Sequence, residues 1–403
     1  MKTEPQSVTP VDALLEQEFS LVAGGPIYQL LLRPGIAEDS IALLSRRILI
    51  ISLFCWLPLC VLTLLEGSFS GKAVVVPFLF DFDSHVRFWV SAPLLIAAEL
   101  IVHRRLGPIV KQFLSRGLVP DHSMPEFRAA IASAYRLRNS LAAEFVLIAI
   151  VYGFGVMVLW NQYLALDTST WYASAGEAGS TLSMAGKWLT YVSLPCFQFL
   201  FLRWYFRIFI WMRFLWHVSR IRLNILPTHP DGIGGLGFLG VTVFAYAPLL
   251  MAHGAQYSGL IANRIFFSNA SLPEFFLMTV ALLVFQMAIV FGPLLVFTPQ
   301  LERARRIGIF EYGALAANYG RAFDKKWVRG GAPADEPLLG SSDIQSLADM
   351  GNSFAVVKSM GIWAISKQDV LLMAMISVAP LLPLGLTMMP LEELIRNLLK
   401  LIF

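Results

Sequence analysis

The chain contains little charge. Of its 403 residues, 14% are Asp, Glu, Lys or Arg, whereas 57% are hydrophobic. Soluble domains carry about 25% charged residues. The composition therefore argues against an ordinary soluble domain and is typical of a protein embedded in a membrane. The net charge of +4 does not indicate nucleic-acid binding, because the basic residues cluster in loops between apolar runs.

Cysteine and metal-binding patterns are equally scarce. The three cysteines, Cys55, Cys60 and Cys196, all lie within apolar runs, where a lone thiol behaves as a small apolar side chain. No Cys-x-x-Cys pair and no His/Cys spacing typical of zinc occurs. We therefore expect no metal site and no cofactor.

Signatures of enzymes and of export are also lacking. The sequence has no Gly-x-Ser-x-Gly, no His-Glu-x-x-His and no paired loop carboxylates beside a histidine. Polar residues, including Glu4, precede the first long apolar run near Ile48, which is not the pattern of a cleavable signal peptide. An enzyme is thus the less favoured class.

Apolar runs long enough to cross a membrane dominate what is present. A helix needs about 20 apolar residues to span the hydrocarbon core. The predicted fold is an all-α polytopic transmembrane bundle of about seven spans with additional cytoplasmic helices. Pro380 and Pro383 interrupt the last run, so a re-entrant segment is an alternative there. The runs are 46–65, 87–103, 140–161, 188–212, 237–261, 274–297 and 369–389.

The basic residues predict the orientation of this bundle. The loop 104–138 holds seven Lys and Arg residues and the segment 300–368 holds nine. The loops 66–87, 160–187 and 262–273 hold two, one and one. Because cytoplasmic loops are enriched in Lys and Arg, we expect the N-terminus in the cytoplasm and the C-terminus outside.

Four regions follow from these patterns. We expect a cytoplasmic amphipathic helix within 1–45, opened by Thr9-Pro10 and ended by Gly24-Gly25. The region 46–299 holds six spans and the basic helical loop 104–139. The region 300–368 is a cytoplasmic helical segment, with a capping box from Ser342 to Gln345. The region 369–403 holds the last span and an amphipathic tail, Leu391–Phe403.

Arg203 and Arg207 lie well inside the apolar run from Trp188 to Trp216. Arg203 lies 16 residues beyond Lys187, about 24 Å along a helix, and Arg207 is one turn further. Glu99 and Glu144 fall at a similar depth in two other spans. The four residues can form a structural ion-pair network whose arginines extend toward the headgroups. Alternatively they line a pathway, and an arginine constriction favours anions.

A glycine-rich loop, Pro227–Phe238, precedes the fifth span. Asp231 is predicted to be the N-cap of the helix that follows, and free N–H groups at a helix start can hold an anion. The alternatives are a tight turn for close helix packing and a metal site at His229 and Asp231, for which two ligands are too few. The candidate residues for an anion or a lipid headgroup are His229, Asp231, Gly232, Gly234, Gly235, Arg220 and Arg222.

Three polar residues, His253, Gln256 and Gln286, lie in the fifth and sixth spans. They could line an aqueous cavity. The alternative is that each makes a hydrogen bond between helices, as polar residues in membrane bundles commonly do.

Two parts of the chain resemble a group of uncharacterised bacterial inner-membrane proteins. They are the stretch from Arg203 through Phe238, which contains His-Pro-Asp-Gly and Gly-Gly-Leu-Gly, and the segment Asp343–Asp349. The resemblance implies a multi-pass protein of the bacterial cytoplasmic membrane and carries no established activity.

These observations favour a channel or transporter for small anions, embedded in the lipid bilayer and assembled as a homo-oligomer. A non-transporting membrane scaffold that recruits a partner is the second hypothesis. The third is an enzyme acting on a lipid phosphate, with His229 as the acid or base.

Overall fold

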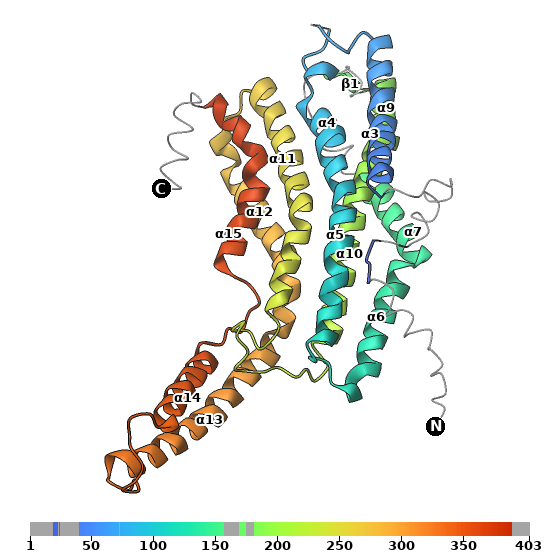
Figure 1. Cartoon of the computed structure of the whole chain (residues 1–403). Coiled ribbons are helices and arrows are strands. Elements are labelled where there is room, and N and C mark those ends of the chain that lie inside the picture. Colours follow the sequence, from blue (N-terminus) through green and yellow to red (C-terminus); the bar gives the residue numbers. More distant parts are fainter. Residues whose placement is uncertain are drawn as a thin grey trace, which may run out of the picture.

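The computed structural model describes residues 19–22, 24, 40–71, 73–156, 169–174 and 181–388. In this part of the chain, long helices lie side by side in a bundle, and α13 and α14 project from one end (Figure 1). The described strands are a short antiparallel pair, β1 (Ala173–Ser174) and β2 (Thr181–Leu182). The all-α prediction is therefore confirmed.

Among the described residues, five helical stretches are long and apolar enough to cross a membrane, and a pair of helices bent by 50° makes a sixth if the pair forms one span. By length and composition, five or six of the about seven spans that we expected are thus present. The five are Leu44–Leu65, Phe82–Ser115, Gly237–Ser268, Leu272–Val328 and Lys367–Thr387, and the bent pair is Asp121–Arg138 with Leu141–Gly155.

The remaining expected span, 188–212, is helical but is not among these candidates. It forms α9 (Met184–Trp188), the π-helical segment η5 (Leu189–Ser193) and α10 (Leu194–Val218). Its arginines, tryptophans and tyrosines make it less apolar than its neighbours. Because α10 packs against α5, α6 and α7, it can bury these larger and more polar side chains.

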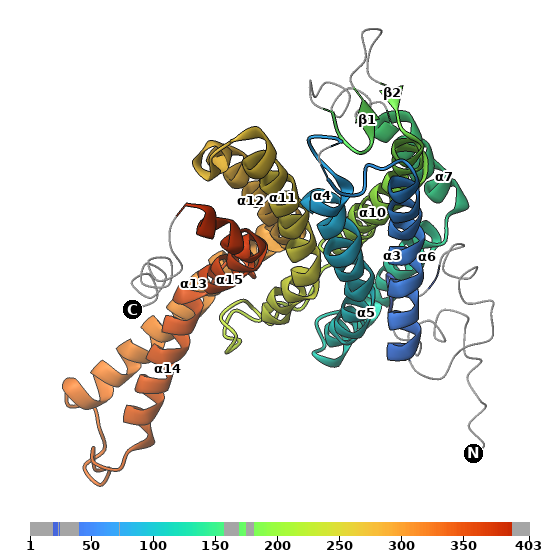
Figure 2. The same cartoon turned by 90° about the horizontal axis from the view of Figure 1, so that it is seen from above.

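The helices are arranged as two groups in the view along the bundle (Figure 2). One holds α3 (Ser40–Leu65), α4 (Phe82–Val86), η2 (Arg87–Ser91), α5 (Ala92–Ser115), α6 (Met124–Arg138), α7 (Leu141–Ile150), η4 (Val151–Gly155) and α10. The other holds α11 (Ala247–Ser268), α12 (Phe276–Phe291) and α15 (Lys367–Val378). Contacts of α11 with α4 and α5 join the two groups.

Short 3-10 segments begin several of these helices or interrupt them near prolines. They are η1 (Phe78–Phe80), η3 (Asp121–Ser123), η6 (Gly237–Tyr246), η7 (Leu272–Phe275), η8 (Gly292–Phe297) and η10 (Ala379–Thr387). Pro293 and Pro380 lie in the first turns of η8 and η10. Proline removes one backbone donor and tightens the helix locally, which explains why the last span continues as a 3-10 helix past Pro380.

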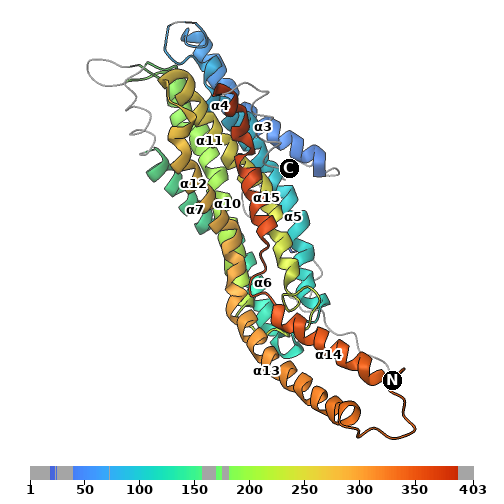
Figure 3. The same ribbon diagram turned by 90° about the vertical axis from the view of Figure 1, so that its left-hand side faces the viewer.

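The helix α13 (Thr298–Phe323), extended by η9 (Asp324–Val328), continues from α12 through η8 and pairs with α14 (Ser342–Ser359) in a projecting hairpin (Figure 3). Asp343 joins the two helices: its carboxylate accepts hydrogen bonds from Lys326 Nζ at 2.8 Å and Trp327 Nε1 at 2.9 Å. These bonds lower the pKa of Asp343. The expected capping box at Ser342 is wrong by one residue, since Ser341 is the N-cap of α14.

The described part of the expected N-terminal helix is not helical. Phe19, Leu21 and Val22 are buried, and the Phe19 ring stacks on Tyr135 of α6 with centroids 5.6 Å apart. Residues 1–18 and the predicted tail 391–403 lie outside the described residues. The segment 19–22 thus packs on the bundle as an irregular chain.

Candidate functional site

The charged residues predicted from the sequence come together inside the bundle. Glu99 of α5 is the centre: its Oε1 lies 2.8 Å from Arg207 Nη2 and 4.0 Å from Arg203 Nη1. Arg203 Nη2 is in turn 4.0 Å from Glu144 Oε1 of α7. All four residues are less than a tenth exposed. Pairing of this kind is what makes buried charges tolerable in a membrane protein.

A fifth member, Arg47 of α3, was missed by the sequence analysis. Its Nη2 donates to Glu99 Oε2 at 2.6 Å. We expected the first span to start at 46, which placed Arg47 at its edge, but α3 already begins at Ser40. Arg47 is therefore one turn or more inside a helix, where its guanidinium reaches Glu99. The charge network, as we name these five residues, contains three guanidinium groups and two carboxylates.

A narrow cleft borders the charge network and is lined by Glu144, Arg203, Arg207 and Arg138. Its volume is about 20 Å³. That is room for one or two waters. The cleft is thus too small for an ion larger than a water molecule.

The glycine loop contains an internal anion. The Asp231 carboxylate accepts hydrogen bonds from the backbone N–H groups of Ile233 at 2.9 Å, Gly235 at 3.0 Å and Gly237 at 2.9 Å. The N–H groups that we expected to be free for an external anion are therefore occupied. The expectation that Asp231 is the N-cap is also wrong: Leu236 is the N-cap of η6, and Asp231 binds the N–H of Gly237, the first residue of η6, from six residues earlier.

Asp231 is more acidic than an ordinary aspartate. Partial burial opposes its ionisation, but the three backbone N–H bonds and the bond to His229 outweigh this and lower its pKa. Hydrogen bonds to the ionised form favour that form. His229 completes the turn: its Nδ1 lies 2.9 Å from Asp231 Oδ1 and 3.2 Å from the Asp231 backbone N, and the ring tautomer decides which of these two contacts is the hydrogen bond.

The glycines serve the turn itself. Gly232, Gly234 and Gly235 have φ of +67°, +63° and +96°, a region that side chains disfavour. The Gly232 carbonyl accepts the Gly361 N–H at 2.8 Å, which ties the turn to the segment after α14. The geometry matches a tight turn for close packing. Within the described residues, no three His, Cys, Asp or Glu side chains are grouped as a metal site would need.

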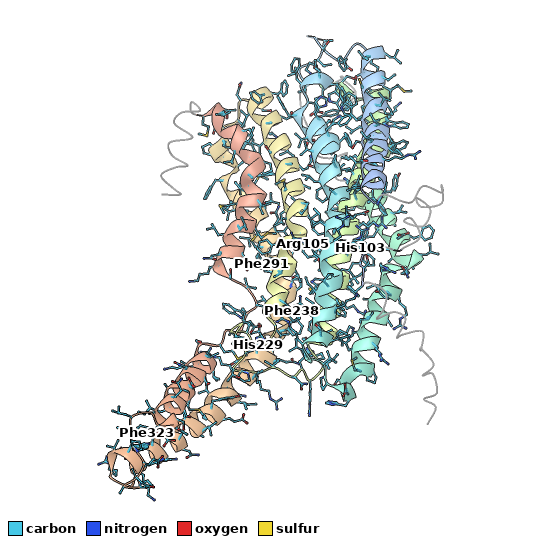
Figure 4. All side chains as sticks on the ribbon, in the orientation of Figure 1. His103, Arg105, His229, Phe238, Phe291 and Phe323 are labelled. Carbon is cyan, nitrogen blue, oxygen red and sulfur yellow. The ribbon has the colours of Figure 1, made fainter. Side chains whose placement is uncertain are left out.

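The arginines expected beside this turn are not the ones found there. Arg220 and Arg222 are exposed, and Arg220 lies 5.0 Å from the centre of the Trp216 ring. Arg116, at the end of α5, takes the expected position: its guanidinium lies 5.1 Å from the centre of the Phe238 ring. Figure 4 shows His229 and Phe238 near each other, where the bundle meets the base of the hairpin.

The three polar residues of the fifth and sixth spans do not form one site. His253 bonds to Tyr205 of α10 and, through Nδ1, to the Leu249 carbonyl at 2.7 Å. Gln256 donates to Asp83, and Gln286 accepts from Ser377 of α15. Each side chain thus has its own partner on another helix or on its own backbone, the arrangement we gave as the alternative to a shared cavity.

A second buried charged group, Asp81, Asp83 and Arg87, was missed. Asp83 pairs with Arg87 four residues on, and Asp81 accepts from Trp171 Nε1 at 2.8 Å and Asn263 Nδ2 at 2.6 Å. We expected a loop here because the predicted span began at 87, yet the helix starts at Phe82. The i, i+4 spacing of Asp83 and Arg87 was the available signal.

Comparisons with protein-family models, curated proteins and solved structures give no match.

Proposed function

We propose that this protein is an integral membrane channel or transporter for small anions. One observation carries the proposal: the charge network inside the bundle contains three guanidinium groups but two carboxylates. In a medium of low dielectric constant, an uncompensated positive charge strongly lowers the energy of an anion. Arginine at a constriction selects for anions in the same way.

Within the network, Arg203 is the guanidinium most available to a passing anion. Arg47 and Arg207 lie within 2.8 Å of the Glu99 carboxylate, whereas the closest carboxylate oxygens to Arg203 are 4.0 Å away. Arg203 also lines the narrow cleft together with Glu144. Glu99 thus positions two arginines, and Arg203 retains hydrogen-bonding capacity for an anion.

The proposal includes a gated pathway. The helix α7, which carries Glu144, meets α6 at a bend of 50° and packs on α10. Movement of α7 away from α10 would separate Glu144 from Arg203 and widen the cleft. We further propose a location in the bacterial cytoplasmic membrane with the N-terminus inside, which rests on the basic segments 104–138 and 300–368, and assembly as a homo-oligomer.

The test is chloride flux in vesicles that contain the purified full-length protein. We expect Arg203→Gln to reduce flux about tenfold, equivalent to about 1.4 kcal/mol of lost anion stabilisation. Arg207→Gln should reduce it as well. The matched control is Arg213→Gln on the same helix, because Arg213 donates to Ser133 at 2.7 Å and lies outside the charge network; its flux should remain close to wild type.

Flux through the wild-type protein that equals leakage of protein-free vesicles would refute the proposal. So would unchanged flux in both the Arg203 and the Arg207 variants. Folding of each variant is checked by its elution profile in detergent, so that a loss of flux is not confused with a loss of structure.

A further inference from the structure

A larger cavity lies at the glycine turn and shares no residue with the charge network. Its volume is about 410 Å³. Ligand sites in proteins commonly measure about 300–1,000 Å³. The cavity is therefore large enough for a small molecule or for the head of a larger one.

Three polar side chains line this cavity: Arg116, His229 and Asn224, whose amide N–H donates to the Gly117 carbonyl at 3.0 Å. Arg116 is exposed, and its one described hydrogen bond is a long one, from Nη1 to the Gly235 carbonyl at 3.4 Å. His229 lines the cavity too, and Asp231 engages its Nδ1. Among the described residues, His229 Nε2 has no hydrogen-bond partner. The guanidinium donors and this ring nitrogen can meet the same anionic group.

The carboxylate of Asp231 cancels only part of the positive electrostatic potential that Arg116 creates at the cavity. Asp231 lies beside His229, but three backbone N–H groups bind its oxygens. Its remaining effect is to hold the imidazole through Nδ1, which leaves Nε2 as the free edge. An anion at the cavity therefore meets the side chains of Arg116 and His229 and not the amides of the glycine loop.

The cavity wall also has an apolar part. Leu118, Ile225 and Leu226 line it, and the Leu226 side chain is 49% exposed. The cavity lies where two candidate spans end, Phe82–Ser115 directly before Arg116 and Gly237–Ser268 directly after the glycine turn. At 34 residues the first of these is about 51 Å long, more than the hydrocarbon thickness, so its end reaches the headgroup region.

We propose that this cavity binds the phosphate group of an anionic amphiphile. The phosphate oxygens accept hydrogen bonds from the Arg116 guanidinium, which matches phosphate geometry with two parallel donors, and from the N–H of His229 Nε2. The adjoining carbons of the amphiphile contact Leu118, Ile225 and Leu226. A membrane phospholipid and free phosphate share this headgroup chemistry, and the apolar wall distinguishes them. The proposal does not depend on anion transport.

The experiment measures thermal unfolding of the full-length protein in a neutral detergent. The titrants are dihexanoyl phosphatidic acid and inorganic phosphate. We expect phosphatidic acid to raise the unfolding temperature with saturation, because a ligand that binds the folded state stabilises it. Arg116→Gln should raise the apparent Kd for phosphatidic acid about tenfold or more, since it removes charged hydrogen bonds. Leu226→Trp, which fills the apolar side of the cavity, should raise this Kd to a similar extent.

The matched control is Arg222→Gln, which removes an exposed arginine that does not line the cavity; its Kd should equal that of the wild type. A response to inorganic phosphate as strong as that to phosphatidic acid, lost in Arg116→Gln, supports the same phosphate site with free phosphate as its source. The proposal is overturned if the wild type shows no saturable response to either titrant. It is also overturned if Arg116→Gln and Arg222→Gln give the same Kd.

Discussion

The side chain of Asp231 decides which anion binds the backbone N–H groups of the glycine turn. A glycine-rich turn presents backbone N–H groups, and in the sequence these indicated a site for an external anion. The anion that occupies them is the carboxylate of the same loop. A carboxylate held two to six residues away needs no separate binding event, so it outcompetes a dissolved anion.

We therefore expect Asp231→Asn to lower stability at neutral pH by about 1–2 kcal/mol, because an amide replaces a charged acceptor of three N–H bonds. The folded-state pKa of Asp231 is lowered, so its contribution is complete above the ordinary pKa of about 3.9 and is lost as the pH falls through the folded value. The difference in unfolding temperature between variant and wild type should be constant from pH 7 to pH 5 and shrink below about pH 4.

Thermal unfolding in detergent at several pH values checks this. The control is Asp335→Asn, an exposed carboxylate in the loop before α14, which should change stability little at any pH. A deficit for Asp231→Asn that persists undiminished at the lowest pH would contradict the assigned role of its charge.

At the scale of elements, glycines set how closely α11 packs on its neighbours. A Cβ added at Gly254 would collide with the Ser377 carbonyl of α15, and one at Gly259 would lie 3.2 Å from the Phe82 carbonyl of α4. Small residues let helix backbones approach closely in membranes, where the hydrophobic effect between helices is weak. Through these glycines the backbone of α11 approaches α15 of its own group at Gly254 and α4 of the other group at Gly259.

Gly254→Ala should lower stability by about 1–3 kcal/mol, because the methyl group forces α11 away from α15. Gly292→Ala is the matched control: its backbone is helical and no atom lies within 4 Å of an added Cβ. In this variant alanine should be neutral or stabilise the helix by up to about 1 kcal/mol. Thermal unfolding of both variants in the same detergent makes the comparison, and equal effects would disprove the packing argument.

At the scale of the whole molecule, one end of the bundle carries the hairpin of α13 and α14, the end of α5 and the glycine turn (Figures 1 and 3). The loop between α3 and η1 lies at the other end. In the orientation that we propose from the positive-inside rule, the basic end faces the cytoplasm. The hairpin, the phosphate-binding cavity that we propose and the basic loop 104–138 would then all face the same compartment.

Cysteine labelling tests this orientation. We expect Ser70→Cys, exposed in the loop after α3, to react with a membrane-impermeant maleimide in intact cells. Asp335→Cys in the hairpin should react only after the membrane is permeabilised. The wild type gives the background, since Cys55 is buried and Cys60 and Cys196 are partly buried. The reverse labelling pattern would invert the proposed topology.

The sequence by itself determined the class of the fold and several participants of the charge network. Low charge and long apolar runs require helices in a membrane, because only helices satisfy their own backbone hydrogen bonds in lipid over so few residues. Helical rise alone put Glu99, Glu144, Arg203 and Arg207 at a similar depth. These inferences depend on local composition and spacing, which a sequence displays directly.

The tertiary structure alone decided the partners. Arg47 meets Glu99 across 52 residues of sequence, and Arg116 lies beside Gly235 across 119. Asp83 and Gln256, which the sequence placed in a loop and in a separate span, share a hydrogen bond. Which helix lies next to which, and at what rotation, depends on the packing of side chains from the whole chain. No local pattern contains that information, so the contents of the network and of the cavity emerged only from the folded bundle.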